Sequence, residues 1–140
     1  MATNVEPKPI PIVDDDSRPY WDAARNQHLS IPKCDSCGLY VFYPRVICPH
    51  CKSEAIVWRD VAGVGVVYSF TIVRFAISSA YAADVPYVVA LIRLNEGVLI
   101  MANIVACQPD EVVIGMRVRV VFEKVSDEIT LPQFCPSGES

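Results

Sequence analysis

The chain has 140 residues, of which 52% are hydrophobic and 20% are charged, and its formal net charge is −4. This length predicts one domain or two small ones sharing an interface, and the apolar content argues against general disorder. No apolar run is long enough for a transmembrane helix, so we expect no membrane association. The first residues lack the pattern of a secretory signal, which predicts a cytoplasmic protein with reduced thiols.

Charge divides the chain into three parts. Residues 1–16 are rich in proline, hold four acids against one lysine (net −3), and are expected to form an extended tail. Residues 17–59 hold six basic and three acidic residues (net +3) and are predicted to form a helix and a ribbon. Residues 60–140 hold five basic and nine acidic residues (net −4) and are predicted to form a barrel with a C-terminal tail.

A short amphipathic helix is expected over residues 18–29. Ser17 suits the N-cap position, and Pro19 falls in the first turn, where its missing N–H costs little. The residues at helical spacing are Tyr20, Trp21, Ala24, His28 and Leu29. Tyr20 and Trp21 are large side chains for so short a helix, and they belong either to the core of this chain or to a partner surface.

The rest of the chain carries strand signals. Residues 39–43 and 55–58 are predicted as short strands of the ribbon because aromatic and β-branched residues dominate them. The strands predicted for the barrel are 61–75, 87–94, 98–105 and 117–125. Gly63 and Gly65 predict a bulge or a sharp coil in the first of these, and residues 95–97 predict a hairpin turn. The predicted fold is mainly β: an N-terminal helix and a four-cysteine zinc ribbon, followed by a five-stranded OB-fold barrel.

Two C-x2-C pairs, Cys34 with Cys37 and Cys48 with Cys51, lie ten residues apart. Such pairs let four thiolates face one ion in a closed tetrahedral shell, which predicts a structural zinc worth about 10–16 kcal/mol to folding. Iron in a rubredoxin-like site is the alternative metal. Since four cysteines fill the shell, we expect His50, inside the second pair, to point outward.

No catalytic residue is predicted. The two remaining cysteines, Cys107 and Cys135, are interpreted as idle thiols, with Cys135 in the tail. No glycine-rich phosphate loop, paired-carboxylate motif or histidine-rich metal centre stands out. A redox or acyl-transfer enzyme that uses Cys107 or Cys135 is an alternative hypothesis, although only the presence of thiols supports it.

The order of these features resembles a known family. The segments that carry the resemblance are Pro19-Tyr-Trp21, Lys33-Cys-Asp-Ser-Cys-Gly38, Tyr43-Pro-Arg45, Cys48-Pro-His-Cys51, Trp58, Gly63-Val-Gly65, Pro86-Tyr87, Ile114-Gly-Met116 and Leu131-Pro-Gln-Phe134. The chain is similar over this span to the family that joins a rubredoxin-like zinc ribbon to an OB fold. That family is catalogued as domain of unknown function thirty-five and linked to acyl-CoA metabolism.

The resemblance implies a non-catalytic accessory subunit. Family members occur with thiolase-like proteins, including thiolases that cleave benzoylsuccinyl-CoA during degradation of aromatic compounds, and with steroid side-chain hydratases or aldolases. In such complexes the catalytic residues belong to the partner, while the small subunit supports assembly and helps to bind CoA. We therefore expect a hetero-oligomer with a thiolase-like subunit, an aldolase partner being the alternative.

The resemblance also suggests CoA or an acyl-CoA as a ligand. The basic residues expected to meet its phosphates are Lys33, Arg45, Lys52 and Arg59, all in the positive part of the chain. Each has the alternative role of a solvated surface charge or of balancing the thiolates around zinc.

A second function class is a module that binds single-stranded nucleic acid, because zinc ribbons and OB barrels both do so. Such a barrel needs a basic groove with exposed aromatic side chains, whereas residues 60–140 have net charge −4. The charge therefore favours the protein partner, and we expect no nucleic acid.

Overall fold

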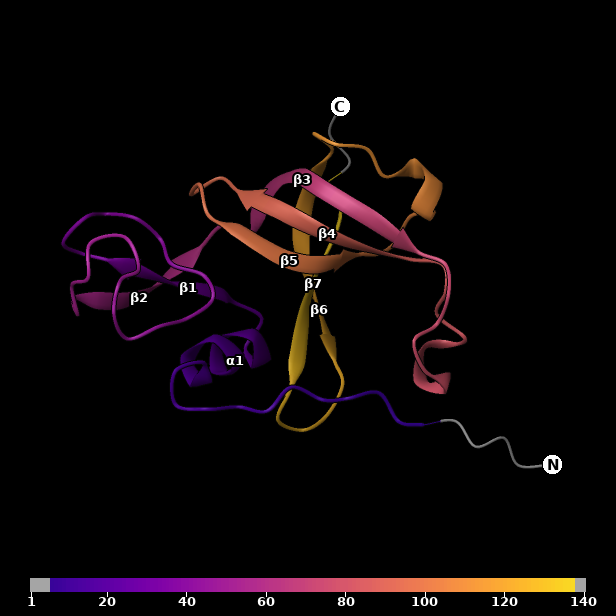
Figure 1. The fold of residues 1–140 in the computed structure, drawn as a ribbon, viewed down its shortest axis with the longest axis horizontal. Coiled ribbons are helices and arrows are strands. Elements are labelled where there is room, and N and C mark those ends of the chain that lie inside the picture. The colour runs from indigo at the N-terminus through magenta and orange to yellow at the C-terminus, as the bar shows by residue number, and fades with distance from the viewer. Residues whose placement is uncertain (1–5, 138–140) are drawn as a thin grey trace.

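The computed structural model describes residues 6–137, which form one α-helix, seven strands and two short 3-10 helices. The elements are α1 (Arg18–Arg25), β1 (Leu29–Cys34), β2 (Ile56–Val61), β3 (Val64–Val73), β4 (Tyr87–Leu94), β5 (Leu99–Ile104), β6 (Arg117–Lys124) and β7 (Thr130–Pro136). The 3-10 helices span Ser79–Tyr81 and Pro109–Glu111. No helix within residues 6–137 is long and apolar enough to cross a membrane. The ribbon of β1 and β2 lies beside the barrel, with α1 below it (Figure 1), so the predicted fold class is confirmed.

Helix α1 begins where expected but ends four residues early. Ser17 is fully buried, and its backbone N–H and hydroxyl both donate to the carboxylate of Asp14, at 2.9 and 2.7 Å, rather than capping the helix. These bonds hold the pKa of Asp14 below its usual range. The helix stops at Arg25 because Gln27 adopts a left-handed conformation, with φ of 64°, that reverses the chain. The prediction of a helix to residue 29 was therefore wrong, and Leu29 begins β1.

Tyr20 and Trp21 belong to the core of this chain. Their exposed fractions are only 8% and 9%. The Tyr20 ring lies 4.9 Å from the ring of Trp21 and 5.6 Å from that of Phe42, between their centroids. Burial raises the pKa of Tyr20. Of the two sequence-based alternatives for these rings, the structure supports the internal core, where they join the helix to the ribbon.

The ribbon has the expected number of strands, but one of them, β1, was not predicted. β1 and β2 pair antiparallel from Leu29 opposite Val61 to Cys34 opposite Ile56. The predicted strand over residues 39–43 is wrong, because only Tyr40 forms an isolated bridge, opposite Lys33. Next to this bridge, the backbone N–H of Val41 donates a hydrogen bond to the carbonyl of Pro32. The chain then turns away from β1, and the following loop brings the second cysteine pair close to the first.

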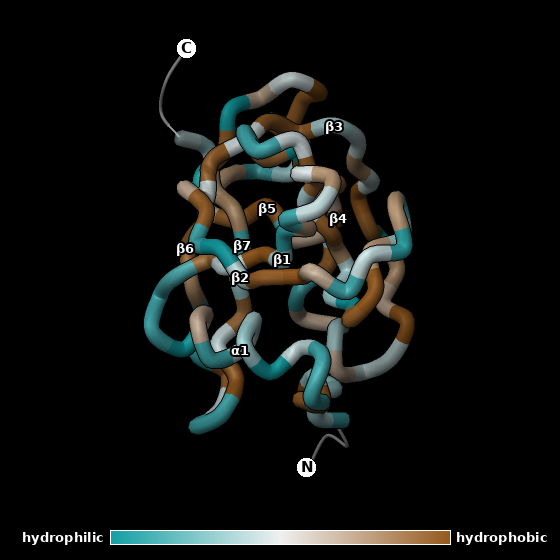
Figure 2. Tube along the Cα trace, turned by 90° about the vertical axis from the view of Figure 1, so that its left-hand side faces the viewer, coloured by the Kyte–Doolittle hydropathy of each residue, from teal (hydrophilic) through white to brown (hydrophobic). Residues whose placement is uncertain are grey.

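The barrel is closed, with strand order β3-β4-β5-β7-β6. Alternate residues of β4 point inward, and hydrophobic stretches follow the strands while hydrophilic residues fill many loops (Figure 2). The hairpin of β4 and β5 is confirmed, with Gly97 at φ of 96° in its turn. The predicted strand 61–75 is instead divided at residues 62–63: β2 ends in the ribbon and β3 begins in the barrel.

The two glycines near this division leave room for neighbouring atoms that a side chain would overlap, and neither forms a bulge. Gly63 has φ of 75°, and a Cβ there would overlap the side chain of Val120. A Cβ at Gly65 would overlap the backbone carbonyl of Arg93. The bulge itself lies further along β3, between Val67 and Ser69. The glycines therefore permit close backbone approach where the chain enters the barrel.

Strand β7 was assigned to a tail by the sequence, and this was wrong. It pairs with β6 over seven residue pairs and meets β5 where Ile104 lies opposite Phe134, which closes the barrel. Pro132 and Pro136 interrupt the alternation that identifies a strand, so the sequence signal is weak. Cys135 accordingly lies buried in a strand.

Replacing Phe134 with alanine is expected to lower the free energy of unfolding by about 3–5 kcal/mol, since the ring is fully buried at the closure of the barrel. Chemical denaturation of the zinc-loaded protein measures this change. Phe75→Ala is the matched control, because that ring is 88% exposed and its removal should change the free energy by less than about 0.5 kcal/mol. Equal losses in the two variants would contradict the role assigned to β7.

Candidate metal centre

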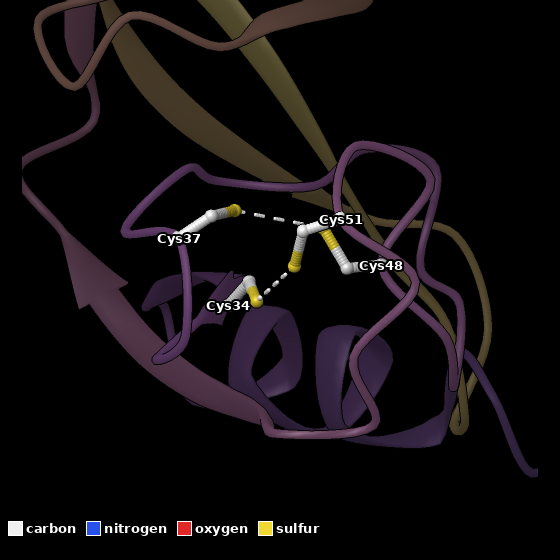
Figure 3. Close-up of side chains that lie close together, drawn as sticks. All are labelled: Cys34, Cys37, Cys48 and Cys51. Carbon is white, nitrogen blue, oxygen red and sulfur yellow. Dashed lines mark hydrogen bonds between the residues drawn. The ribbon is translucent and has the colours of Figure 1, made fainter.

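Four cysteines from two loops converge on one point. Their Sγ atoms all lie within 4.8 Å of one another, and the close pairs, Cys34 with Cys51 and Cys37 with Cys48, are 3.5 and 3.7 Å apart (Figure 3). Zinc–sulfur bonds of about 2.3 Å in a tetrahedron separate the sulfurs by about 3.8 Å. The donor set and its spacing therefore fit a tetrahedral ion of the size of zinc.

The two cysteine pairs are built by the same local structure. In the first, the N–H of Gly38 bonds the carbonyl of Cys34 at 2.7 Å, and in the second, the N–H of Lys52 bonds that of Cys48 at 2.8 Å. Gly38 and Lys52 both have positive φ, 81° and 68°. The sequence signalled this conformation at Gly38 but not at Lys52, because a lysine rarely adopts it. The two turns then present their thiols to a common centre.

Backbone N–H groups favour the thiolate form at this site. Those of Cys37 and Ser36 lower the pKa of Cys34 to about 7. The backbone N–H of His50 donates a hydrogen bond to the sulfur of Cys48 at 3.4 Å. His50 itself is exposed and is not part of the cysteine cluster. These are the interactions expected around metal-bound thiolates.

In the ribbon, a bound metal would supply stability that a larger domain obtains from its hydrophobic core. The ribbon has a small buried cluster of Cys34, Val41 and Cys48, with Ile56 packed against it, while Cys37 and Cys51 are exposed. A bound zinc would supply a cross-link between the two loops that this cluster is too small to provide. Four cysteine ligands leave no position for a substrate, so the arrangement suits a structural site.

The four basic residues expected to bind CoA come from β1, β2 and the loop between them, and Lys33 and Arg59 lie on the same face of the two paired strands. The Lys33 ammonium lies 5.7 Å from the ring centroid of Tyr40, and Arg59 pairs with Asp35 at 3.8 Å. Arg45 lines a shallow pocket together with three acids, namely Asp15, Asp16 and Glu54. Lys52 is exposed beside the second cysteine pair.

The two other cysteines lie in the barrel. Cys107, half-buried after β5, has its pKa raised by burial and by the nearby carboxylate of Glu111. Cys135 is buried in β7. A raised pKa disfavours the nucleophilic thiolate form of Cys107 at neutral pH.

Both parts of the fold match known family models. Residues 21–57 match the rubredoxin-like zinc ribbon domain of ChsH2, and residues 58–123 match its C-terminal OB-fold domain. A DUF35 domain-containing scaffold protein of Methanocaldococcus jannaschii is 36% identical over 69% of this chain and 68% of that protein. The chain belongs to the DUF35 family. Membership of a zinc-ribbon family and the sulfur geometry together support a structural zinc in this DUF35 chain.

Two further proteins are similar over most of the chain. A probable enoyl-CoA hydratase alpha subunit of Thermomonospora curvata is 35% identical over 93% of this chain, which spans 40% of that relative's length. The solved structure of an Ltp2-ChsH2(DUF35) aldolase matches with a TM-score of 0.82 and 34% identity, covering 91% of this chain and 99% of the matched one.

The purified DUF35 chain is expected to hold one zinc ion and to be colourless, whereas iron would absorb visible light. Cys48→Ser should lose the metal and unfold at a lower temperature, because Cys48 is a fully buried member of the ribbon's small core. Elemental analysis and thermal unfolding measure both effects. Cys107→Ser is the control and should keep one zinc per chain; loss of zinc from this variant instead would overturn the assignment of ligands.

Proposed function

We propose that this chain is a non-catalytic, zinc-stabilised accessory subunit of an acyl-CoA enzyme, supporting assembly of a thiolase or thiolase-like complex and binding of CoA or acyl-CoA. The observation that carries the proposal is the match over 99% of a chain in a solved DUF35 aldolase complex. Relatives named as scaffold proteins and as a subunit of an enoyl-CoA hydratase point to the same class of role.

The names of these relatives mention an aldolase and a hydratase but no thiolase. That the partner of this chain is thiolase-like is therefore a more specific proposal of our own. It derives from the resemblance of the cysteine, Gly-x-Gly and Ile-Gly-Met segments to the family that accompanies thiolases. Degradation of aromatic compounds, with benzoylsuccinyl-CoA as one substrate, is the pathway we propose for it. Lys33, Arg45, Lys52 and Arg59 remain the ribbon residues proposed to approach CoA phosphates.

The docking surface must differ from the one suggested by the sequence. Tyr20 and Trp21 are buried and are not available to a partner. Between its two cysteine pairs, the ribbon instead exposes four large apolar side chains with exposed fractions of 47–63%. These are Leu39, Tyr43, Val46 and Ile47. Apolar side chains that protrude from a metal-stabilised loop are suited to fill pockets on a partner protein.

The face on which OB folds bind nucleic acid is largely apolar in this chain, and Arg93 is the one basic residue on its strands β4 and β5. That face is formed by the second and third barrel strands, here β4 and β5, together with neighbouring loops. Its outward side chains include Val89, Leu91 and Met101, which line a shallow depression with Ser69 and Thr71 of β3. Binding of a single strand relies on positive charge and aromatic stacking, so this surface favours the accessory-subunit proposal.

The chain, tagged and purified from its native host, is expected to bring with it a thiolase-like subunit that mass spectrometry identifies. The complex should catalyse CoA-dependent cleavage of a β-ketoacyl-CoA, and the chain alone should not. Cleavage activity in the isolated chain, or co-purification of an aldolase or hydratase in place of a thiolase, would contradict the thiolase proposal.

Replacing Tyr43 with alanine and Val46 with serine is expected to weaken the complex by about tenfold to a hundredfold, because exposed anchors of this kind dominate interfaces. The Kd measured by titration calorimetry with the purified partner tests this. Tyr68→Ala with Val113→Ser is the matched control, since Tyr68 is as exposed as Tyr43 (47% and 48%) but lies on the barrel. An unchanged Kd in the ribbon variant, with its zinc retained, would place the interface elsewhere.

A further inference from the structure

Three arginines of the barrel share one patch of its outer surface. Val66 of β3 lies opposite Arg93 of β4 on one side and opposite Arg117 of β6 on the other. Arg119 follows two residues later on β6, so it faces the same way as Arg117. All three are exposed, whereas Val118 between the last two is buried. The strand pairing therefore brings together three of the five basic residues found in residues 60–140.

Strand geometry sets the size of this patch. Neighbouring strands lie about 4.8 Å apart, so the backbones of Arg93 and Arg117 are separated by about 10 Å, and those of Arg117 and Arg119 by about 7 Å. Side chains as long as arginine can cover these separations. Three guanidinium groups can thus reach one ligand that carries more than one negative charge.

Three acids of the barrel have partners other than these arginines. Glu123, further along β6, accepts a hydrogen bond from Gln133, and one carboxylate oxygen of Glu96 accepts one from the N–H of Ala62. Asp110 pairs with Arg74. Within residues 6–137, no salt bridge involves Arg93, Arg117 or Arg119. Three positive charges therefore lie together without an acidic partner among the described residues, in a part of the chain whose net charge is −4.

An aromatic ring completes the patch. The guanidinium of Arg93 lies 4.6 Å from the ring centroid of Tyr68, whose residue remains 47% exposed. This contact orients one guanidinium before any ligand arrives. It also leaves ring surface open to a flat group such as a nucleobase.

We propose that Arg93, Arg117, Arg119 and Tyr68 form a binding site for the phosphate groups and base of a nucleotide. Guanidinium groups bind phosphate oxygens through paired, charge-assisted hydrogen bonds, and three of them match a ligand with several phosphate charges. Resting on the proposed function, the nucleotide is the phosphorylated ADP end of CoA. The ribbon residues considered first have four acidic neighbours, Asp15, Asp16, Asp35 and Glu54, whereas no salt bridge within residues 6–137 involves the three barrel arginines.

Titration calorimetry of the zinc-loaded chain, alone and in its purified complex, tests this site. The probes are CoA, adenosine 3′,5′-bisphosphate, pantetheine and a single-stranded DNA oligonucleotide. CoA and the bisphosphate should bind, with affinity that falls as salt rises, and pantetheine should not, since it lacks the phosphates. Arg117→Gln and Arg119→Gln should each weaken CoA binding by about tenfold or more, because each removes a charge-assisted contact.

Arg74→Gln and Arg25→Gln are the matched controls, because both remove an exposed arginine charge away from the patch, and both should leave CoA affinity within about twofold. Equal loss in Arg25→Gln and Arg117→Gln would overturn the site, as would pantetheine binding as tightly as CoA. Binding of the oligonucleotide in preference to CoA would also overturn it, in favour of a nucleic-acid surface.

The same variants separate this inference from the proposed function. If Arg117→Gln still assembles with its partner and still binds CoA normally, the nucleotide site is wrong while the accessory role stands. If Arg117→Gln loses the partner but the wild-type chain binds no phosphate compound, the patch is a protein interface and the nucleotide proposal fails. If no acyl-CoA enzyme co-purifies with the wild-type chain, the accessory role fails whatever the chain binds.

Discussion

The convergence of four cysteine sulfurs is the interaction on which the ribbon depends. Two strands of six residues and a buried cluster of three side chains cannot hold two long loops by hydrophobic packing alone. A tetrahedral ion bound by Cys34, Cys37, Cys48 and Cys51 would fix both loops at once and set the direction of the apolar side chains between them. We therefore expect the surface proposed to meet a partner to depend on an intact metal site.

The ribbon and barrel are joined by packing as well as by the chain. Tyr20 and Trp21 of α1 belong to the same core cluster as Leu29 and Ile31 of β1 and as Phe134 of β7. A change in the orientation of the ribbon must consequently disturb residues at the closure of the barrel. This continuity gives a scaffold a defined angle between its two parts, which a flexible linker would not provide.

The parts of the fold that sequence reasoning found were those with strong local signals. The cysteine spacing identified the four residues that cluster, and the turn at residues 95–97 between two strand-like segments identified the hairpin of β4 and β5. Strand β7 was missed because its prolines break the alternation, and the helix was extended to Leu29, the first residue of β1, because Leu29 fits helical spacing. Lys52 has a left-handed backbone conformation, which a lysine in the sequence does not predict. In each case a tertiary contact outweighed the local preference.

Charge shows the same dependence on tertiary structure. A net value of −4 for residues 60–140 argues against an anion site, and no stretch of the sequence there contains a basic run. Yet Arg93 and Arg117 are brought to the two sides of Val66 by β pairing between segments far apart in the chain. Because screening limits surface electrostatics to about 8–10 Å, a ligand at this patch responds to the local arginines far more than to distant acids. Net charge over a domain can therefore exclude a strongly basic groove, as required for nucleic acid, without excluding a compact site for a nucleotide.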